Sequence, residues 1–372
     1  MALNLSRNTR ILASTVSKTA ITGWSGAAAT ANTFELNVLD GYSFSQSTNV
    51  TDITLSEAGT APQRGKRSFN DSLAPVDWSF TTYIRPYQYN DGTDDLNSSG
   101  ERILWAALWG DALADTAEGV DGTTPYMRAT TTTSALAEPM KIQLYFVMDN
   151  TVYHLQDACV NTVEVDFSID GIAQATWSGY ANVIDDFTST KSSWVAGTDY
   201  YSVPTGADFI RNKLSTVDIS EIGGSTYGLA LTGGSVSIDN GITYLTPEEL
   251  GVRNEPIGSF TGARQVSGTL NAYLKTGGAA DTGDLFDLMS TKTDTENKFN
   301  VAMNMGGVAA AGGGIPGVKF SIPTCQLQIP TVDVQDVIAT TINFSAQGTD
   351  GSGNYDIGAD NEMTVDYFNV NS

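Results

Sequence analysis

The chain has 372 residues, of which 41% are apolar, so it can bury a substantial core and is not a disordered protein. It carries 42 Asp and Glu against 19 Lys and Arg, which gives a formal net charge of −23. A surface this acidic repels phosphate, which excludes proteins that grip nucleic acid but suits a surface that DNA passes without sticking.

The first half contains an ordered series of expected elements. An Arg–Asn pair at Arg7–Asn8 comes first, followed by an alternating strand over 76–84, VDWSFTTYI. Apolar residues at helical spacing then predict a short helix over 101–113, and strands follow over 141–148 and 152–167.

The second half repeats this order. It has an Arg–Asn pair at Arg211–Asn212, a strand over 266–274, a helix over 282–292 and a strand over 298–305. The matching positions are Tyr83 with Tyr273, Val152 with Val318, Cys159 with Cys325, Val163 with Ile329 and Phe167 with Val332. The offset slips from 166 to 165 residues along the last strand, as a β-bulge would require.

The repeat predicts a mainly β fold of two tandem duplicated domains, each a β-sandwich or barrel with one short flanking α-helix and a long loop arm. The expected boundaries are 1–190 for the first domain, 191–206 for a linker, 207–348 for the second domain and 349–372 for a C-terminal tail. A last strand is expected at Met363–Phe368. Cys159, Cys325, Tyr83 and Tyr273 are expected to be equivalent core positions, and the two cysteines are not expected to pair.

Each half also carries a long excursion, over 47–75 and 239–262, which we expect to fold as an arm. Basic residues gather in the first arm and acidic residues occur in the second, which favours docking between copies, with a solvated hairpin tip as the alternative. The arm candidates are Ile53, Leu55, Arg64, Lys66, Arg67, Phe69, Tyr244, Leu245, Glu248, Glu249 and Arg253.

Groups suited to catalysis are scarce. His154 is the only histidine, so a two-His metal site or a Ser–His–Asp triad within one chain is excluded. The glycine-rich segment 309–317 lacks a P-loop lysine, and the acidic segment 91–101 has Leu96 where a calcium loop needs glycine. We expect no catalytic residue, no metal and no cofactor. We also expect no membrane span and no signal peptide.

Several segments resemble the tail tube proteins of bacteriophages with long, non-contractile tails. They are SRNTRILASTV, the stretch from STNVTDITL to VDWSFTTYI, FIRNKLSTV and the stretch from ITYLTPEEL to VSGTLNAYL. The resemblance is strongest to the branch with two fused tube domains that forms trimeric, pseudo-hexameric rings. Some members of that branch add an immunoglobulin-like domain, for which too little chain follows Phe344 here.

The resemblance implies a structural protein of the virion, made in the bacterial host cytoplasm. Copies would form stacked rings around a channel for genome delivery. The implied partners are further copies of the chain, a tape measure protein, the tail terminator and the tail-tip or baseplate proteins. Double-stranded DNA would pass without specific binding, and no membrane is involved. Glu164 and Asp166 are candidates for the acidic lining, with the outer solvated face as the alternative.

Two other functions remain open from the sequence. An acidic extracellular β-protein could bind glycans or cell surfaces, and its aromatic cluster would be TDYYSV at 198–203 with Trp194. An enzyme is disfavoured by the missing motifs. Self-assembly distinguishes a tube protein from a binding protein and from an enzyme, because a tube protein works only as a polymer.

Overall fold

The computed structural model describes most of the chain as antiparallel β-strands with two short α-helices, so the mainly β prediction is confirmed. The described residues are 9–15, 33–53, 67–85, 101–109, 127–130, 140–149, 151–186, 200, 211–247, 254–278, 280–291, 297–306, 317–333, 337–349 and 361–368.

The first half consists of two layers that share one long strand, β7 (Thr151–Ser168). The outer layer has the order β2-β1-β6-β7-β9, and the second layer has the order β3-β4-β8-β7. Cys159 lies where β7 leaves the outer layer for the second one. The other strands are β1 (Thr9–Ser14), β2 (Thr33–Leu36), β3 (Ser43–Ile53), β4 (Arg67–Tyr83), β6 (Ile142–Met148), β8 (Gln174–Ala181) and β9 (Ile184–Asp186).

The second half has the same kind of arrangement around β17 (Gly317–Leu327). Its outer layer runs β11-β10-β16-β17-β20, and its other layer runs β12-β15-β19, with β17 and β18 both paired to β19. Cys325 marks the crossing from β16 to β19. The strands are β10 (Thr216–Glu221), β11 (Thr226–Gly228), β12 (Leu231–Asp239), β15 (Gln265–Tyr273), β16 (Phe299–Met305), β18 (Thr331–Asp333), β19 (Ala339–Ala346) and β20 (Thr364–Phe368).

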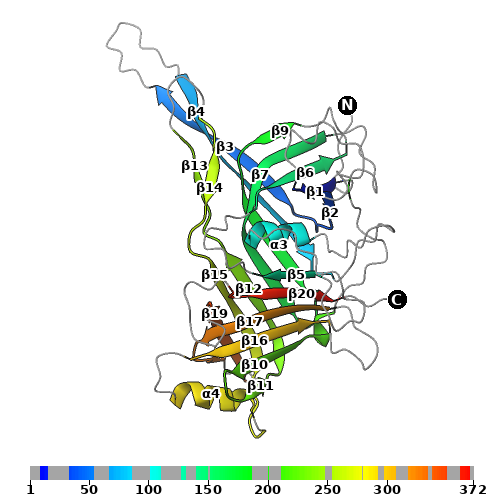
Figure 1. The fold of residues 1–372 in the computed structure, drawn as a ribbon, viewed down its shortest axis with the longest axis vertical. Helices are drawn as coiled ribbons and strands as arrows, with labels where there is room; N and C mark the ends of the chain where they lie inside the picture. The colour runs from blue at the N-terminus through cyan, green and yellow to red at the C-terminus, as the bar shows by residue number, and fades with distance from the viewer. Residues whose placement is uncertain are drawn as a thin grey trace.

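The two halves share a sheet. Strand β12 of the second half pairs antiparallel with β7 of the first, from Gly233 opposite Ser168 to Asp239 opposite Thr162. The second layers of both halves therefore form one continuous sheet in the order β3-β4-β8-β7-β12-β15-β19 (Figure 1). We call this the joined sheet.

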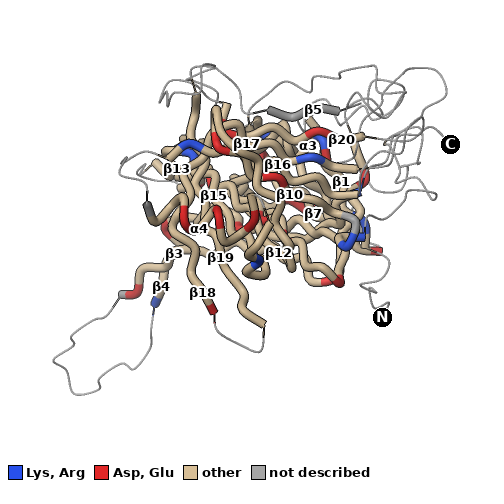
Figure 2. Tube along the Cα trace, turned by 90° about the horizontal axis from the view of Figure 1, so that it is seen from below, with Lys and Arg blue, Asp and Glu red and all other residues tan. Residues whose placement is uncertain are grey.

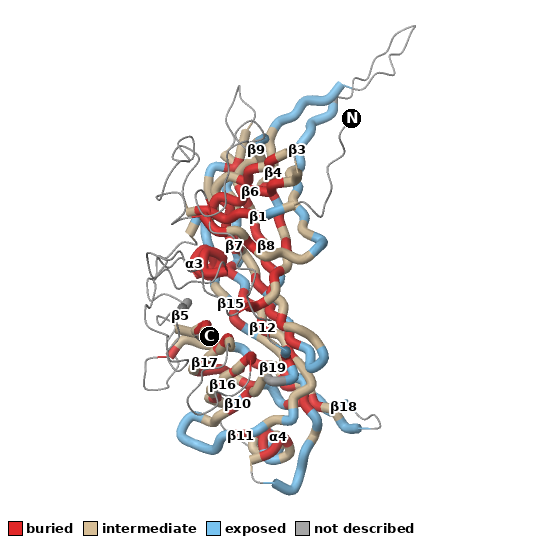
Figure 3. Tube along the Cα trace, turned by 90° about the vertical axis from the view of Figure 1, so that its right-hand side faces the viewer, coloured by how far each residue is buried: buried red, intermediate tan, exposed pale blue. Residues whose placement is uncertain are grey.

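The core also continues from one half into the other (Figure 3). Helix α3 (Arg102–Trp109) is the centre of this continuity, because the ring of Trp105 lies 4.8 Å from Trp177 of β8 and 6.1 Å from Phe320 of β17. The expected helix is confirmed, but every residue of it is buried rather than one face alone, since both halves cover it.

The remaining elements extend the two halves. Helix α4 (Thr282–Thr291) confirms the second expected helix and is capped by Asp281, whose Oδ1 accepts hydrogen bonds from the backbone N–H groups of Gly283 and Asp284 at 3.0 and 3.1 Å. The expected last strand is β20, which pairs with β17 and also with β5 (Met127–Thr130) of the first half. The short strands β13 (Thr243–Leu245) and β14 (Gly258–Phe260) form a hairpin.

Candidate functional site

One face of the joined sheet is exposed to solvent and carries mainly hydroxyl and amide side chains. Strand alternation places apolar residues toward the core and polar residues on the opposite face. Cross-strand contacts confirm the shared face: Thr81 Oγ1 lies 3.1 Å from Thr176 Oγ1, and Thr341 Oγ1 donates to Asn271 Oδ1 at 3.0 Å. Its members include Ser43, Ser45, Asp77, Ser79, Thr81, Thr162, Glu164, Asp166, Thr176, Ser178, Ser235, Ser237, Asp239, Ser267, Thr269, Asn271, Thr341, Asn343 and Ser345.

This face carries acidic side chains, and none of the members named above is Lys or Arg. Glu164 and Asp166 are exposed at its centre, opposite Ser237 and Ser235 of β12. Asp77 on β4 and Asp239 on β12 add two more carboxylates to this face, and Figure 2 shows acidic residues on many parts of the trace. Such a face offers hydrogen bonds but repels a phosphate backbone.

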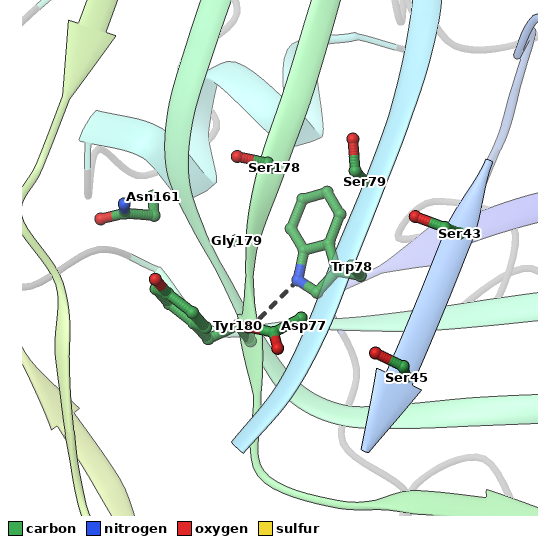
Figure 4. Close-up of a pocket in the computed structure, with 9 residues that line it drawn as sticks. All are labelled: Ser43, Ser45, Asp77, Trp78, Ser79, Asn161, Ser178, Gly179 and Tyr180. Carbon is green, nitrogen blue, oxygen red and sulfur yellow. Dashed lines mark hydrogen bonds between the residues drawn. The ribbon is translucent and has the colours of Figure 1, made fainter. Parts of the chain in front are cut away.

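A hollow of about 260 Å³ opens on this face between β3, β4 and β8 (Figure 4). Its lining includes Ser45, Asp77, Ser178 and Tyr180, and Asp77 is the one carboxylate among the lining residues. Trp78 forms one side and donates its indole N–H to the carbonyl oxygen of Tyr180 at 3.2 Å. The lining therefore offers one carboxylate among hydroxyl groups and no second carboxylate with which it could form an acid–base pair.

The described part of the first arm is a pair of antiparallel strands. Strands β3 and β4 stay paired as far as Ile53 opposite Arg67 (Figure 1). Phe69 is 45% exposed on this hairpin, and the Arg67 guanidinium lies 5.2 Å from its ring centroid. Leu55, Arg64 and Lys66 lie outside the described residues. The arm therefore presents an apolar ring and a cation to solvent.

The second arm, the β13–β14 hairpin, is fixed against the first half of the same chain. The Tyr244 hydroxyl donates to the carbonyl oxygen of Asp157 at 3.3 Å, and its ring meets Tyr180 edge-on at 5.9 Å. Ser259 Oγ lies 3.4 Å from Cys159 Sγ. Burial raises the pKa of the Tyr244 phenol. Tyr244 thus packs against the first half of its own chain, and its part in a contact between rings stays a prediction.

Three apolar residues of this hairpin and its flank are exposed. Leu245, Ile257 and Phe260 are 53%, 63% and 54% exposed, and the part of Leu245 in a contact between rings stays a prediction. Glu248, Glu249 and Arg253 lie outside the described residues.

Asn161 and Asn240, which the sequence analysis missed, join the two halves through hydrogen bonds at the base of the second arm. The Asn161 backbone carbonyl accepts from the Asn240 N–H at 3.0 Å, and Asn161 Oδ1 accepts from the Ile242 N–H at 2.7 Å. The Asn240 side chain donates to the carbonyl oxygen of Leu108 in α3 at 2.6 Å. Neither asparagine belongs to a sequence motif, and their roles depend on the bulge in β7 between Val160 and Thr162.

The second half exposes apolar residues where the first half buries them. Val163 and Phe167 of β7 lie on the core face of the joined sheet and are 0% and 4% exposed. Their predicted counterparts in the second half, Ile329 and Val332, are 58% and 43% exposed. Among the described strands, β18 pairs only with β19 and β3 pairs only with β4, so each end of the joined sheet has an open edge.

The four repeat-equivalent positions do not behave alike. Cys159 and Cys325 are both fully buried and unpaired, as predicted, and burial raises the pKa of Cys325 to about 12. Tyr83 is half-buried and Tyr273 is 45% exposed. The prediction of core tyrosines was therefore wrong, because strand alternation places both on the solvated face.

Among the groups considered for chemistry, His154 lies in the described part of the chain. His154 is buried, stacks on Tyr145 at 4.4 Å and lies 2.7 Å through Nε2 from Gln143 Oε1. No cluster of three or more metal-ligating side chains occurs among the described residues. In the same part of the chain, no helix is long and apolar enough to cross a membrane.

The aromatic cluster proposed for glycan binding has one described member. Tyr200 is 2% exposed and packs beside Leu12, Val147 and Val152. This burial removes it as an exposed stacking platform. Trp194, Tyr201 and the segments 91–100 and 309–316 lie outside the described residues.

Comparison with known proteins gives two matches. The chain matches the family of phage tail tube proteins over residues 20–346. It is also 34% identical over 317 residues to the tail tube protein pb6 of Escherichia phage T5. That alignment covers 82% of this chain and 65% of pb6, so the chain spans slightly less than two thirds of its relative.

Proposed function

Since the chain belongs to the phage tail tube protein family, a family of structural virion proteins rather than enzymes, we propose that three copies close into a pseudo-hexameric ring and that rings stack into a tube. The two halves of each copy are duplicated tube domains in this proposal. The channel of the tube carries the genome to the host.

The seam between β7 and β12 is the observation that carries the proposal. Inside one chain, the second half adds its β12 to the β7 edge of the first half and buries Val163 and Val165. At one open edge, Ile329 just before β18 and Val332 within β18 are exposed to solvent. The other open edge is β3, which comes before β4 in the first half as β12 comes before β15 in the second half. Pairing β3 of one copy with the β17–β18 edge of the next repeats the internal seam and closes exposed edges.

The size of the resulting barrel supports three copies. About eight strands per copy give a barrel of about 24 strands. With strands about 4.8 Å apart and tilted by about 45°, the backbone circle is roughly 50 Å across. Such a barrel leaves an open channel after side chains line it, which double-stranded DNA can traverse.

The solvated face of the joined sheet lines this channel in the proposal. Closing the sheet so that its apolar face turns outward toward the outer layers leaves Glu164 and Asp166 pointing inward. Hydroxyl groups and carboxylates without bases give a lining on which DNA does not bind specifically. The same channel holds the tape measure protein before ejection, and the tube ends contact the tail terminator and the tail-tip or baseplate proteins.

The test replaces Ile329 and Val332 with Asp and images the tails of virions assembled with the variant. We expect a folded protein that forms no rings, because charges at the seam cannot be buried unpaired. The matched control is Ile222→Asp, a 39% exposed residue in the turn after β10, which should leave rings intact. Normal tubes from the double variant would refute the seam.

A further inference from the structure

The internal seam between β7 and β12 pairs residues of matched character. Val165 of β7 lies opposite Val236 of β12, and both side chains are fully buried on the core face. The pairs on the solvated face are Asp166 with Ser235 and Glu164 with Ser237. A slip of one residue would move every side chain of one strand to the other face, so the alternation fixes this register.

Strand β3 holds the place beside β4 that β12 holds beside β15. Ser43 of β3 lies opposite Ser79, and Ser235 of β12 lies opposite Thr269. Ser79 and Thr269 each lie four residues before the matched tyrosines of the repeat, Tyr83 and Tyr273. Strand pairing therefore places Ser43, Phe44 and Ser45 where the second half has Ser235, Val236 and Ser237.

Strand β18 holds the place beside β19 that the end of β7 holds beside β8. Gln174 of β8 lies between Tyr83 and Asp166 in the sheet, because it pairs with both. Ala339 of β19 pairs in the same way with Tyr273 on one side and with Asp333 of β18 on the other.

Asp333 therefore takes the place of Asp166, with Val332 in the place of Val165 and Thr331 in the place of Glu164. This match by strand pairing lies two residues from the sequence match of Val332 with Phe167. Val332 is 43% exposed, whereas Val165 is fully buried beside β12. Among the described strands, β18 thus lacks the neighbour that β7 has in β12.

That neighbour cannot be β3 of the same chain. The two strands lie at opposite ends of the joined sheet, far apart along the long axis of the molecule (Figure 3). Ser43 and Ser45 are exposed on β3, as Thr331 and Asp333 are on β18. A second copy of the chain can bring these two edges together.

We propose that β3 of one copy pairs antiparallel with β18 of the next copy in the register of the internal seam. The pairs are Ser43 with Asp333, Phe44 with Val332 and Ser45 with Thr331. Both seams then set a serine against an aspartate on the solvated face and an apolar pair on the core face. The inference rests on the proposed ring and adds which residues meet, and it assigns Asp333 to the channel lining as the counterpart of Asp166.

The test places cysteines across the proposed contact. Ser45→Cys with Thr331→Cys sets two residues directly opposite, at a Cα separation of about 4.5–5.5 Å that a disulfide spans. Ser237→Cys with Glu164→Cys is the matched control at the same step of the internal seam. Ser43→Cys with Thr331→Cys joins diagonal neighbours about 7–8 Å apart and tests a register displaced by two residues.

Virion tails assembled with each full-length variant are oxidised and then analysed by denaturing electrophoresis without reductant. The native Cys159 and Cys325 are fully buried and do not interfere. We expect the Ser45/Thr331 variant to give covalent dimers and trimers, with the trimer as the largest species. The internal control should remain a single chain of altered mobility.

Each other result has a distinct meaning. Intact tails in which the internal control cross-links but Ser45/Thr331 chains stay single would overturn the register and leave the ring standing. Cross-linking of Ser43/Thr331 in place of Ser45/Thr331 would do the same. Covalent chains longer than trimers would support the register and overturn the ring of three copies. Absence of the wild-type protein from virion tails would overturn both.

An exchange of one pair tests the register without cysteines, including the case in which the cysteine variants form no tails. Ser43→Asp sets a second carboxylate opposite Asp333, and like charges directly opposite weaken strand pairing, so we expect several-fold fewer complete tails. Adding Asp333→Ser restores the serine–aspartate pair and should restore the number of tails. Adding Asp218→Ser instead restores only the net charge, at an exposed residue of β10, and should not. Undiminished tails from Ser43→Asp, or no recovery with Asp333→Ser, would overturn the register.

Discussion

The indole N–H of Trp105 donates a hydrogen bond of 2.9 Å to the hydroxyl of Tyr367, although the two residues are 262 positions apart. The Tyr367 hydroxyl in turn donates to a carboxyl oxygen of Glu101, and all three side chains are buried. Strand β20, near the end of the chain, is thereby attached to helix α3 of the first half. The two halves are therefore joined by a buried chain of hydrogen bonds.

Replacing Tyr367 with Phe should destabilise the protein by about 1–3 kcal/mol, because the Trp105 N–H loses its acceptor inside the core. The change is measured as the free energy of unfolding in urea. Tyr273→Phe is the control, since Tyr273 is 45% exposed and the same atom is removed; its effect should stay within about 0.5 kcal/mol. Equal effects from both substitutions would contradict the buried hydrogen-bond chain.

Glu101 should make stability depend on pH. Burial raises its pKa from 4.5 to about 8, against smaller lowering effects of Tyr367 and Arg85. Between these values the unfolded chain releases the proton and the folded chain keeps it, so this group lowers the free energy of unfolding as pH rises from about 4.5 to about 8. The total is of order 5 kcal/mol.

A Glu101→Gln variant should therefore gain stability relative to wild type as pH rises through this window. Urea unfolding at pH 5 and pH 8 measures the difference, with exposed Glu164→Gln as the control. If the wild-type and Glu101→Gln proteins give parallel pH profiles, Glu101 is ionised in the folded protein.

Gly179 should not tolerate a methyl group. A Cβ atom there would lie 2.0 Å from the carbonyl oxygen of Cys159 and 2.9 Å from the Trp78 ring. We expect Gly179→Ala to cost at least about 1–3 kcal/mol, through displacement of β8 from β7. Gly228→Ala is the control, since nothing lies within 4 Å of its Cβ position. A Gly179→Ala protein as stable as the control would mean that the sheet shifts freely at this point.

The strands and helices were predictable because periodicity depends on local sequence. The alternation over 76–84 and 266–274 became β4 and β15, and both apolar helices formed where expected. The joining of β7 to β12 was not predictable, because pairing between strands about 70 residues apart leaves no local signal. The duplication and the domain boundaries stay predictions, although both halves arrange their strands around a long central one.

The candidate site was predictable in its chemistry more than in its geometry. Glu164 and Asp166 could be placed on a polar strand face from alternation alone, and their inward orientation in a tube remains a proposal. The packing of Tyr244 on its own chain was not predictable, because hydrophobicity in an arm does not tell whether it packs on its own chain or on another copy. Asn161 and Asn240 were missed because their amides act through a bulge that only the folded sheet reveals.

The acidic lining can be tested by reversing charge at its centre. Tubes of a Glu164→Lys, Asp166→Lys variant should assemble but retain DNA, with binding that weakens as salt rises from 50 to 200 mM. Asp218→Lys is the control, because Asp218 is exposed on β10 in the outer layer and not on the joined sheet. DNA release from virions with variant tails measures the effect. Unchanged release, or equal DNA binding by the control, would place Glu164 and Asp166 on the outside of the tube.

The first arm should control stacking between rings. Lys66→Glu with Arg67→Glu removes the cation that lies against the exposed Phe69 ring and puts negative charge on an arm that meets an acidic body. We expect folded protein and normal rings, but shorter or absent tubes in electron micrographs, with partial recovery at high salt because screening weakens the repulsion. Lys141→Glu with Lys275→Glu makes the same charge change at exposed positions away from the arm and should leave tube length unchanged. If both double variants shorten tubes equally, net charge and not the arm controls stacking; if neither does, the arm does not contact the next ring.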